Sequence, residues 1–278
     1  MPTMNSNIGE VGRGFAAFLS PPPEGVVRFT VGQPDFRTPQ PVVDSAKAAL
    51  DAGEHGYTRS QGSEEVCEAV ANYLSKYDLD VDANDVLVSP GCKQALLYAM
   101  MSCLNPGDEV LLFAPAWPSY DGMLKLIGAI PVHVPVRRDN YHPDMTATRA
   151  AISDKTKAIV INSPNNPTGA VYHPSEIEEL TAIAAENDLW IFDDMIYSDL
   201  DLLRPLLCLA SNIRRRKGEN LDNRRMVQDL GDDRLEVRLD YRSNPCNGGS
   251  QNLSSKCCKS RSNIPNGGWS YCPKFGRG

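Results

Sequence analysis

Long apolar runs and a secretory leader are the first features that this sequence lacks. No stretch approaches the roughly eighteen consecutive apolar residues that a membrane-spanning helix needs. Residues 1–10 show no basic start followed by an apolar run, which a signal peptide would have. The first absence argues against a membrane helix, and together the two predict a soluble, cytoplasmic protein with no membrane partner.

Recognisable metal-binding spacings are missing as well. The eight cysteines form no CxxC pair, and none of the four histidines belongs to an HExxH motif. In a chain without a secretory signal, scattered cysteines favour reduced thiols over a disulfide framework. The sequence therefore predicts neither a metal site nor a fold held together by disulfides.

Acidic and basic residues are unevenly divided along the chain. Residues 1–200 hold 13 Lys and Arg against 27 Asp and Glu, whereas residues 201–278 hold 15 against 8. A basic second part would normally suggest a nucleic-acid-binding tail. A shift of reading frame, argued below, accounts for this asymmetry, so we expect no nucleic-acid partner.

Helical and strand patterns alternate over the first 200 residues. Apolar residues recur at helical spacing from Pro39 to Leu50 and from Glu64 to Tyr73. The expected strands are Asp85 to Ser89, Glu109 to Phe113, Lys157 to Asn162 and Leu189 to Asp193, and the helices expected between them are Lys93 to Leu104, Tyr120 to Ile127 and Pro174 to Glu186. This alternation predicts an α/β fold with a mostly parallel sheet and helices on both faces.

Aliphatic periodicity fades after about Leu200. The remainder holds a basic run, Arg214 to Lys217, and glycine-rich segments such as Asn247 to Ser250. Such a composition buries too little apolar surface to fold alone. We expect an N-terminal arm over 1–28, a partial α/β domain over 29–200 and a disordered tail over 201–278.

Several loops that follow the expected strands carry unusual residues, and open α/β sheets bind their ligands at the carboxyl ends of the strands. The loop Ser89 to Lys93 turns a strand into a helix start, where backbone N–H groups and the helix dipole suit a phosphate. An ordinary strand-to-helix turn has the same pattern, so both interpretations stay open.

Three further positions suit a flat, charged ligand. The loop Ser163 to Gly169 has two prolines that restrict φ and two asparagines whose amides can point at a ligand. Asp193 and Asp194 end an apolar strand, where a buried carboxylate without a cation is costly, although one of them could cap a helix. Trp117 offers a face for stacking on a ring, although a plain core or surface position is commoner.

Taken together, these motifs resemble those of class I/II, aspartate-aminotransferase-like, fold-type I aminotransferases, continuously from about Phe29 to Leu200. The resemblance implies pyridoxal 5'-phosphate (PLP) as cofactor and a large domain of the PLP-transferase fold, with the C-terminal part and the small domain missing. It assigns Gly91, Cys92 and Lys93 to the cofactor phosphate, Trp117 to ring stacking, Asn166 and Tyr197 to the phenolic oxygen, Asp194 to the pyridinium nitrogen, Tyr57 to the phosphate in a partner subunit and Gly32 to the substrate carboxylate. Met195 stands where the family usually has glutamate.

The resemblance also implies a homodimer that moves an amino group from an amino acid to a 2-oxo acid. A PLP-dependent β-elimination lyase on the same fold is one alternative, because a fold does not determine a reaction. A non-catalytic remnant that binds PLP is the other. The residues that would distinguish one amino-acid substrate from another lie largely outside the part that resembles the family.

One family feature is absent, namely the Schiff-base lysine in a Ser-Lys segment followed by Met-Thr-Gly-Trp-Arg. Read one nucleotide later, the codons of Met226 and Val227 force Trp, and those of Gln228 and Asp229 allow only Lys or Arg. The codons over 217–239 then permit the whole missing segment, with its lysine across Gln228 and Asp229. We hypothesise a frameshift between about residues 200 and 217, and we expect the chain as given to be truncated and catalytically impaired.

Overall fold

The computed structural model describes residue 8, residues 23–27, 36–75 and 81–198, and the backbone of two further strands at 226–229 and 235–239. The chain divides into two compact units, Met1–Tyr241 and Arg242–Gly278. All described residues belong to the first unit. Within them, no helix is long and apolar enough to cross a membrane.

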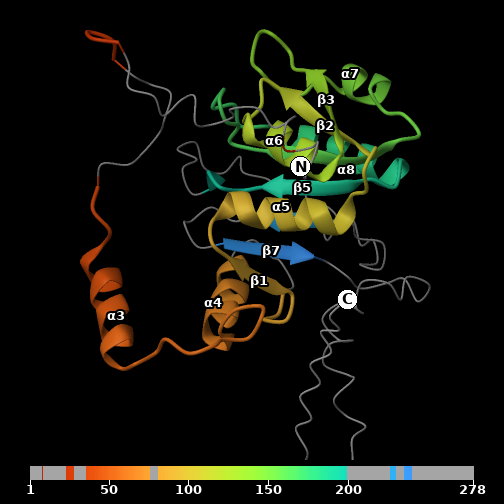
Figure 1. Ribbon diagram of the computed structural model, residues 1–278. Coiled ribbons are helices and arrows are strands. Elements are labelled where there is room, and N and C mark those ends of the chain that lie inside the picture. Colours follow the sequence, from red (N-terminus) through yellow and green to blue (C-terminus); the bar gives the residue numbers. More distant parts are fainter. Residues whose placement is uncertain are drawn as a thin grey trace, which may run out of the picture. The chain divides into compact units, whose positions relative to one another are not determined.

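The described strands form one seven-stranded sheet with the order β1-β7-β6-β5-β4-β2-β3 (Figure 1). Its strands are β1 (Val86–Ser89), β2 (Glu109–Ala114), β3 (Ile130–Pro135), β4 (Thr156–Asn162), β5 (Trp190–Asp194), β6 (Met226–Asp229) and β7 (Leu235–Leu239). Neighbouring strands from β3 through β6 pair in parallel, and β7 is antiparallel to both β6 and β1. The prediction of a mostly parallel sheet is confirmed.

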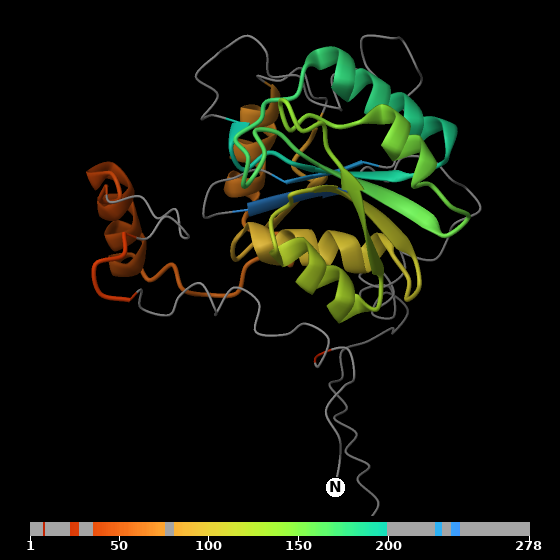
Figure 2. The ribbon, with the colours of Figure 1, turned by 90° about the horizontal axis from the view of Figure 1, so that it is seen from above.

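Helices cover both faces of this sheet (Figure 2). Helices α5 (Cys92–Cys103) and α6 (Ser119–Ile127) pack on one face, and α7 (Met145–Ala150) and α8 (Pro174–Glu186) pack on the other. Side chains of a strand point alternately to its two faces, so Val110 and Leu112 join the α5 core while Leu111 and Phe113 join the α8 core. A strand that is covered by helices on both faces needs apolar side chains at successive positions, and β2 has them.

Two helices precede the sheet. Helix α4 (Glu64–Ser75) buries Cys67, Val70 and Leu74 in a small core that also contains Val86 of β1. Helix α3 (Gln40–Asp51) has the expected apolar spacing, yet none of its residues is buried. The helical prediction is thus confirmed for both segments.

Strand β3 and helix α7 were not expected from the sequence. Strand β3 contains Pro131 and Pro135, and proline lacks the N–H that a central strand needs. Its place at the edge of the sheet removes that requirement on one side. Helix α7 is only six residues long, too short for a clear helical period.

Two described strands, β6 and β7, fall in the segment 201–278, for which we expected a disordered tail. Both lie in that segment, and the structure gives them strand backbone paired in the sheet. Leu235, Val237 and Leu239 alternate with Glu236 and Arg238, which is a strand pattern that the sequence analysis overlooked. The rest of 201–278 lies outside the described residues.

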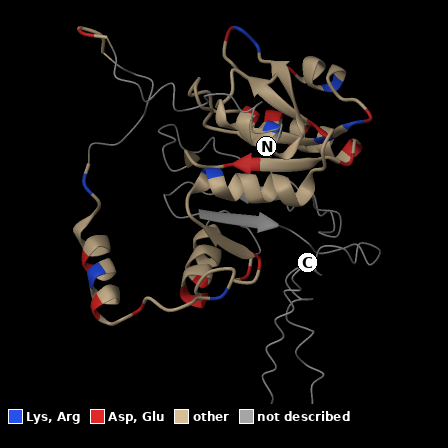
Figure 3. Ribbon diagram, in the orientation of Figure 1, with Lys and Arg blue, Asp and Glu red and all other residues tan. Residues whose placement is uncertain are grey.

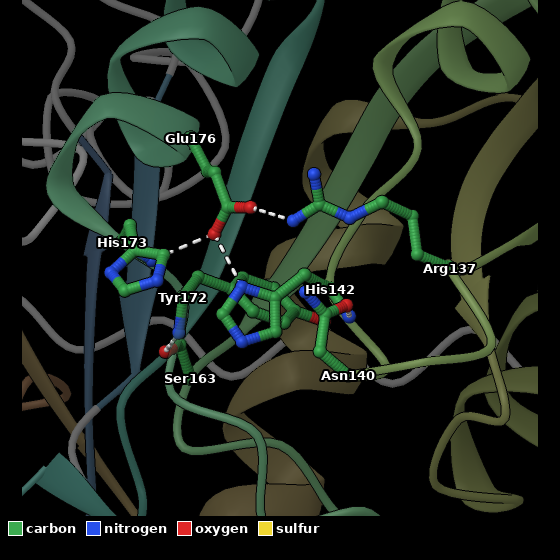
Figure 4. A network of polar contacts seen from close by, with 7 residues as sticks. All are labelled: Arg137, Asn140, His142, Ser163, Tyr172, His173 and Glu176. Carbon is green, nitrogen blue, oxygen red and sulfur yellow. Dashed lines mark hydrogen bonds and ion pairs between the residues drawn. The ribbon is translucent and has the colours of Figure 1, made fainter.

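A polar network holds the start of α8 (Figure 4). The Glu176 carboxylate accepts a hydrogen bond from the Arg137 guanidinium, lies 2.7 Å from His142 Nδ1 and accepts the His173 backbone N–H at 2.8 Å. Arg137 and His142 belong to the loop after β3, which Val136 and Pro143 close by a β-bridge. Glu176 therefore ties this loop to the helix.

Candidate active site

Four of the loops chosen from the sequence meet at one edge of the sheet. Strand β1 is antiparallel to β7, which is antiparallel to β6, so β1 runs in the same direction as β2, β4 and β5. The carboxyl ends of these strands therefore share an edge. The loops there carry Gly91 to Lys93 after β1, Trp117 after β2, Asn166 after β4 and Tyr197 after β5.

Asp194 is the last residue of β5 and is only 2% exposed. Its Oδ2 accepts a hydrogen bond from the Tyr120 hydroxyl, and its Oδ1 accepts the Ile196 backbone N–H at 3.2 Å. It forms no ion pair with any described residue. Burial raises the pKa of the Asp194 carboxyl, and these two hydrogen bonds offset part of that rise. The carboxylate is thus kept away from water without a cation beside it.

Asn162, the last residue of β4, joins two of the expected site residues. Its Nδ2 donates to the Asp194 backbone carbonyl at 3.0 Å, and its Oδ1 accepts the Asn166 backbone N–H at 2.8 Å. Asn166 in turn donates from Nδ2 to the Tyr197 hydroxyl at 3.1 Å. One buried amide therefore fixes the Asn166 loop against the end of β5.

The Tyr197 hydroxyl stays protonated in this setting. Burial raises the pKa of Tyr197, the hydrogen bond from Asn166 lowers it, and the nearby Asp194 and Cys92 raise it further. The net direction is upward. Tyr197 is therefore a neutral hydroxyl that can donate to an oxygen or accept from Asn166.

Trp117 connects the two ends of the site. Its ring lies 5.3 Å from that of Tyr120, centroid to centroid, in an edge-to-face arrangement. The Lys93 ammonium lies 5.2 Å from the Trp117 ring centroid, within cation–π range. Through Trp117, the cationic side chain after β1 is linked to the residue that contacts Asp194.

The turn before α5 leaves open space beside Gly91. Gly91 is the N-cap residue with φ of 88°, a conformation that favours glycine, and a Cβ placed there would meet nothing within 4 Å. Cys92 and Lys93 form the first turn of the helix, whose N-terminus carries partial positive charge. The arrangement suits an anion.

The described residues do not place every expected site residue in this group. The Tyr57 side chain is fully exposed, and Gly32 lies outside the described residues. Gln228 and Asp229 belong to β6, where their backbones pair with Asp193 and Asp194 of β5. The backbone positions of the shifted lysine codon are therefore next to the end of β5.

Tyr120 and Asn162 are two site residues that sequence reasoning missed. Tyr120 fits the apolar side of a short helix, and nothing local indicates that its hydroxyl meets a carboxylate 74 residues later. Asn162 did carry a signal, because an amide that ends a buried apolar strand needs partners. Periodicity by itself predicts only that Asn162 ends a strand.

Residues 24–202 match the family model described as aminotransferase class I and II, and the chain belongs to this family. Members of this family depend on PLP. The aspartate aminotransferase of Sulfolobus acidocaldarius is 40% identical over 176 residues, covering 62% of this chain and 44% of that protein. The one from Thermotoga maritima is 40% identical over 179 residues, covering 64% and 48%.

Solved structures agree with this assignment. An aspartate aminotransferase from Thermus thermophilus, determined with maleate, superimposes with a TM-score of 0.76 and 30% identity, covering 86% of this chain and 65% of that one. The predicted fold class is confirmed. The chain spans about half the length of the curated relatives that it matches.

Proposed function

We propose that the site at the end of β5 binds pyridoxal 5'-phosphate. Asp194 carries the proposal, because it is a buried carboxylate that pairs with no described cation. A protonated ring nitrogen would supply the positive charge that such a carboxylate needs. The residues present therefore fit the group that the family uses.

The surrounding residues would hold the other parts of the cofactor. Gly91, Cys92 and Lys93 would bind the phosphate at the helix N-terminus, and Trp117 would stack on the ring. Asn166 and Tyr197, already hydrogen-bonded to each other, would bind the phenolic oxygen. When bound, the cofactor supplies an electron sink for negative charge at the substrate α-carbon. Asp194 keeps the ring nitrogen protonated for that purpose.

For the whole protein we propose transfer of an amino group from an amino acid to a 2-oxo acid by a homodimer. The names of the relatives support this activity. The fully exposed side chain of Tyr57 supports the dimer, because a tyrosine that reaches a partner's phosphate must project from its own subunit. Gly32 would contact the substrate carboxylate.

We further propose that the coding sequence carries a frameshift before residue 217. The lysine codon of the shifted frame spans Gln228 and Asp229, whose backbones pair with Asp193 and Asp194. The chain as given then lacks the proton carrier, which normally contributes about 10²–10⁴-fold to rate. Resequencing the gene from the codon for Asp194 to that for Arg242 tests this. A single-base insertion or loss that restores the Ser-Lys segment would support the proposal, an unchanged sequence would leave the chain truncated and inactive, and nucleotides that do not encode the segment in the shifted frame would refute the proposal.

The missing lysine favours a second candidate function for the chain as given, a protein that binds PLP without catalysis. It would bind the cofactor reversibly, and borohydride reduction would leave no cofactor attached to a lysine peptide. A frame-corrected protein would retain the label after reduction. A label on the present chain would contradict the assignment of the lysine to the shifted frame.

Titration with PLP tests cofactor binding directly. We expect saturable quenching of tryptophan fluorescence, since Trp117 lies in the site. Asp194→Asn should raise Kd about 30-fold or more, the factor that corresponds to ~2 kcal/mol for a buried charge that loses its partner. Asp154→Asn, at an exposed position on a loop, is the matched control and should leave Kd unchanged. Equal affinity of both variants would refute the proposed role of Asp194.

A further inference from the structure

Tyr120 is a buried tyrosine of α6 whose hydroxyl donates to Asp194 Oδ2. The residue is 2% exposed and belongs to the core between α5, α6 and the sheet. A phenol buried in an apolar core needs a partner for its hydroxyl. Here that partner is a carboxylate at the end of a strand, so two otherwise costly buried groups satisfy each other.

The two oxygens of Asp194 have different kinds of donor. Oδ1 accepts a backbone N–H from the turn that follows β5, which any residue at position 196 other than proline would supply. Oδ2 accepts the Tyr120 hydroxyl, the one side-chain donor to this carboxylate among the described residues. Only the second contact depends on the identity of a side chain.

Tyr120 is also held in place by its neighbours. Its ring meets Trp117 edge-to-face at 88°, which limits rotation of the phenol and therefore the direction of its hydroxyl. The core around it includes Leu124 of the same helix and Phe192 of β5. This packing thus holds the Tyr120 hydroxyl in an orientation that points to Asp194.

We propose that Tyr120 is a positioning residue that keeps Asp194 ionised and aimed at the cofactor ring nitrogen. This inference rests on the proposed function. A hydrogen bond donated to a carboxylate stabilises the charged form over the neutral acid. Burial acts in the opposite direction on the same group, so loss of the hydroxyl should raise the pKa of Asp194 further.

The other titratable groups near Asp194 do not replace this effect. Tyr197 follows β5 and stays neutral, and Cys92 at the start of α5 raises the pKa of Tyr197, as does Asp194. Asp193 precedes Asp194 in the strand, and the backbone of Asp229 in β6 is the register partner of Asp194. None of these groups is a cation. The Tyr120 hydroxyl from α6 is therefore the side-chain group that, together with the Ile196 backbone N–H, favours the ionised form.

The test compares Tyr120→Phe with Tyr172→Phe in the full chain. Tyr172 is equally buried but belongs to the core on the other face of the sheet, so it controls for loss of a buried hydroxyl. The protonation midpoint of Asp194 is followed in the cofactor-free protein by ¹³C NMR of labelled aspartate, with Asp194→Asn for assignment. The Kd for PLP is measured over the same pH range.

Tyr120→Phe should raise the Asp194 midpoint by about one pH unit or more, a tenfold change in its ionisation equilibrium. The Kd for PLP should rise about tenfold, and the acidic limb of its pH profile should move upward. Tyr172→Phe should change neither. A loss of affinity that is the same at every pH, or an unchanged midpoint, overturns the proposal.

Fluorotyrosine at position 120 covers the case in which the phenylalanine variant does not fold. Its hydroxyl is a stronger donor in the same shape, so the Asp194 midpoint should fall, and a rise or no change overturns the proposal. If the chain binds no PLP but the midpoint moves as expected, the proposed function fails while the control of Asp194 by Tyr120 stands.

Discussion

Replacement of Glu176 by glutamine tests whether the polar network at the start of α8 stabilises the fold. The carboxylate has three donors, from Arg137, His142 and the backbone of His173 (Figure 4). Burial raises the pKa of Glu176, but the three donors outweigh it and hold the pKa of this carboxyl below its ordinary value. A glutamine presents an NH₂ group to one of these donors and carries no charge.

The expected cost of Glu176→Gln is about 2 kcal/mol at pH 7. Removing one partner from a fully buried ion pair costs about 3–5 kcal/mol, and the 43% exposed Arg137 reduces that figure. Such a loss corresponds to a fall in Tm of roughly 4–8 °C for a protein of this size. Glu178→Gln, at an exposed position of the same helix, should change Tm by less than about 1 °C.

The lowered pKa of Glu176 determines how the effect of Glu176→Gln on the unfolding free energy changes with pH. A carboxyl whose pKa is lower in the folded state stabilises the fold above its unfolded pKa, about 4.3 for glutamate, and loses that effect as pH falls through the folded value. The difference in unfolding free energy between the original chain and Glu176→Gln should therefore be complete at pH 7 and shrink below about pH 4. Urea unfolding at pH 7, 5 and 3 measures it. A difference that stays constant to pH 3, or equal destabilisation by Glu178→Gln, would refute the reasoning.

Three further predictions follow from single side chains. Gly91→Ala should cost about 1–3 kcal/mol through backbone strain alone, since space for the Cβ is open, and urea unfolding would show whether it does. Leu111→Ala, in the fully buried centre of β2, should cost about 2–5 kcal/mol in the same assay, and a smaller loss would contradict the core assignment. Because the pKa of Tyr197 is raised, this residue should contribute no tyrosinate absorbance below pH 10, and Tyr197→Phe should leave the absorbance titration below that pH unchanged. A smaller absorbance change below pH 10 in the variant would contradict the burial of the Tyr197 hydroxyl.

The grouping of several candidate site residues at one edge of the sheet was predictable, because these residues end strands or lie in the loops after them. Asp194 ends one apolar strand and Asn166 lies in the loop after another, and the structure places both at one edge of the sheet. Helix α8 has the predicted bounds because Pro174 suits the first turn and the Glu176 side chain accepts the His173 backbone N–H. Such signals are local, so they can be identified from backbone preferences and from the order of the strands without knowledge of the tertiary structure.

Edge position and pairing partners were not predictable in the same way. The prolines of β3 argue against a strand until its place at the sheet edge is known. The short strand β7 is antiparallel between β6 and β1, and no local pattern names two partners from opposite ends of the domain. The edge position of β3 and the pairing partners of β7 depend on which apolar surfaces of the sheet remain to be buried once the other strands and helices have packed.

By itself, the sequence determined the alternation of strands and helices, the turn chemistry and the polar residues after each strand, because these follow from short-range periodicity and backbone restriction. Only the tertiary structure decided which of those polar residues meet. The contact of Tyr120 with Asp194 joins residues 74 positions apart, and Asn162 joins two loops through one amide. Such contacts depend on the packing of α6 against β5 and on the register of β4 with β5, and both are set by burial of apolar surface over the whole domain.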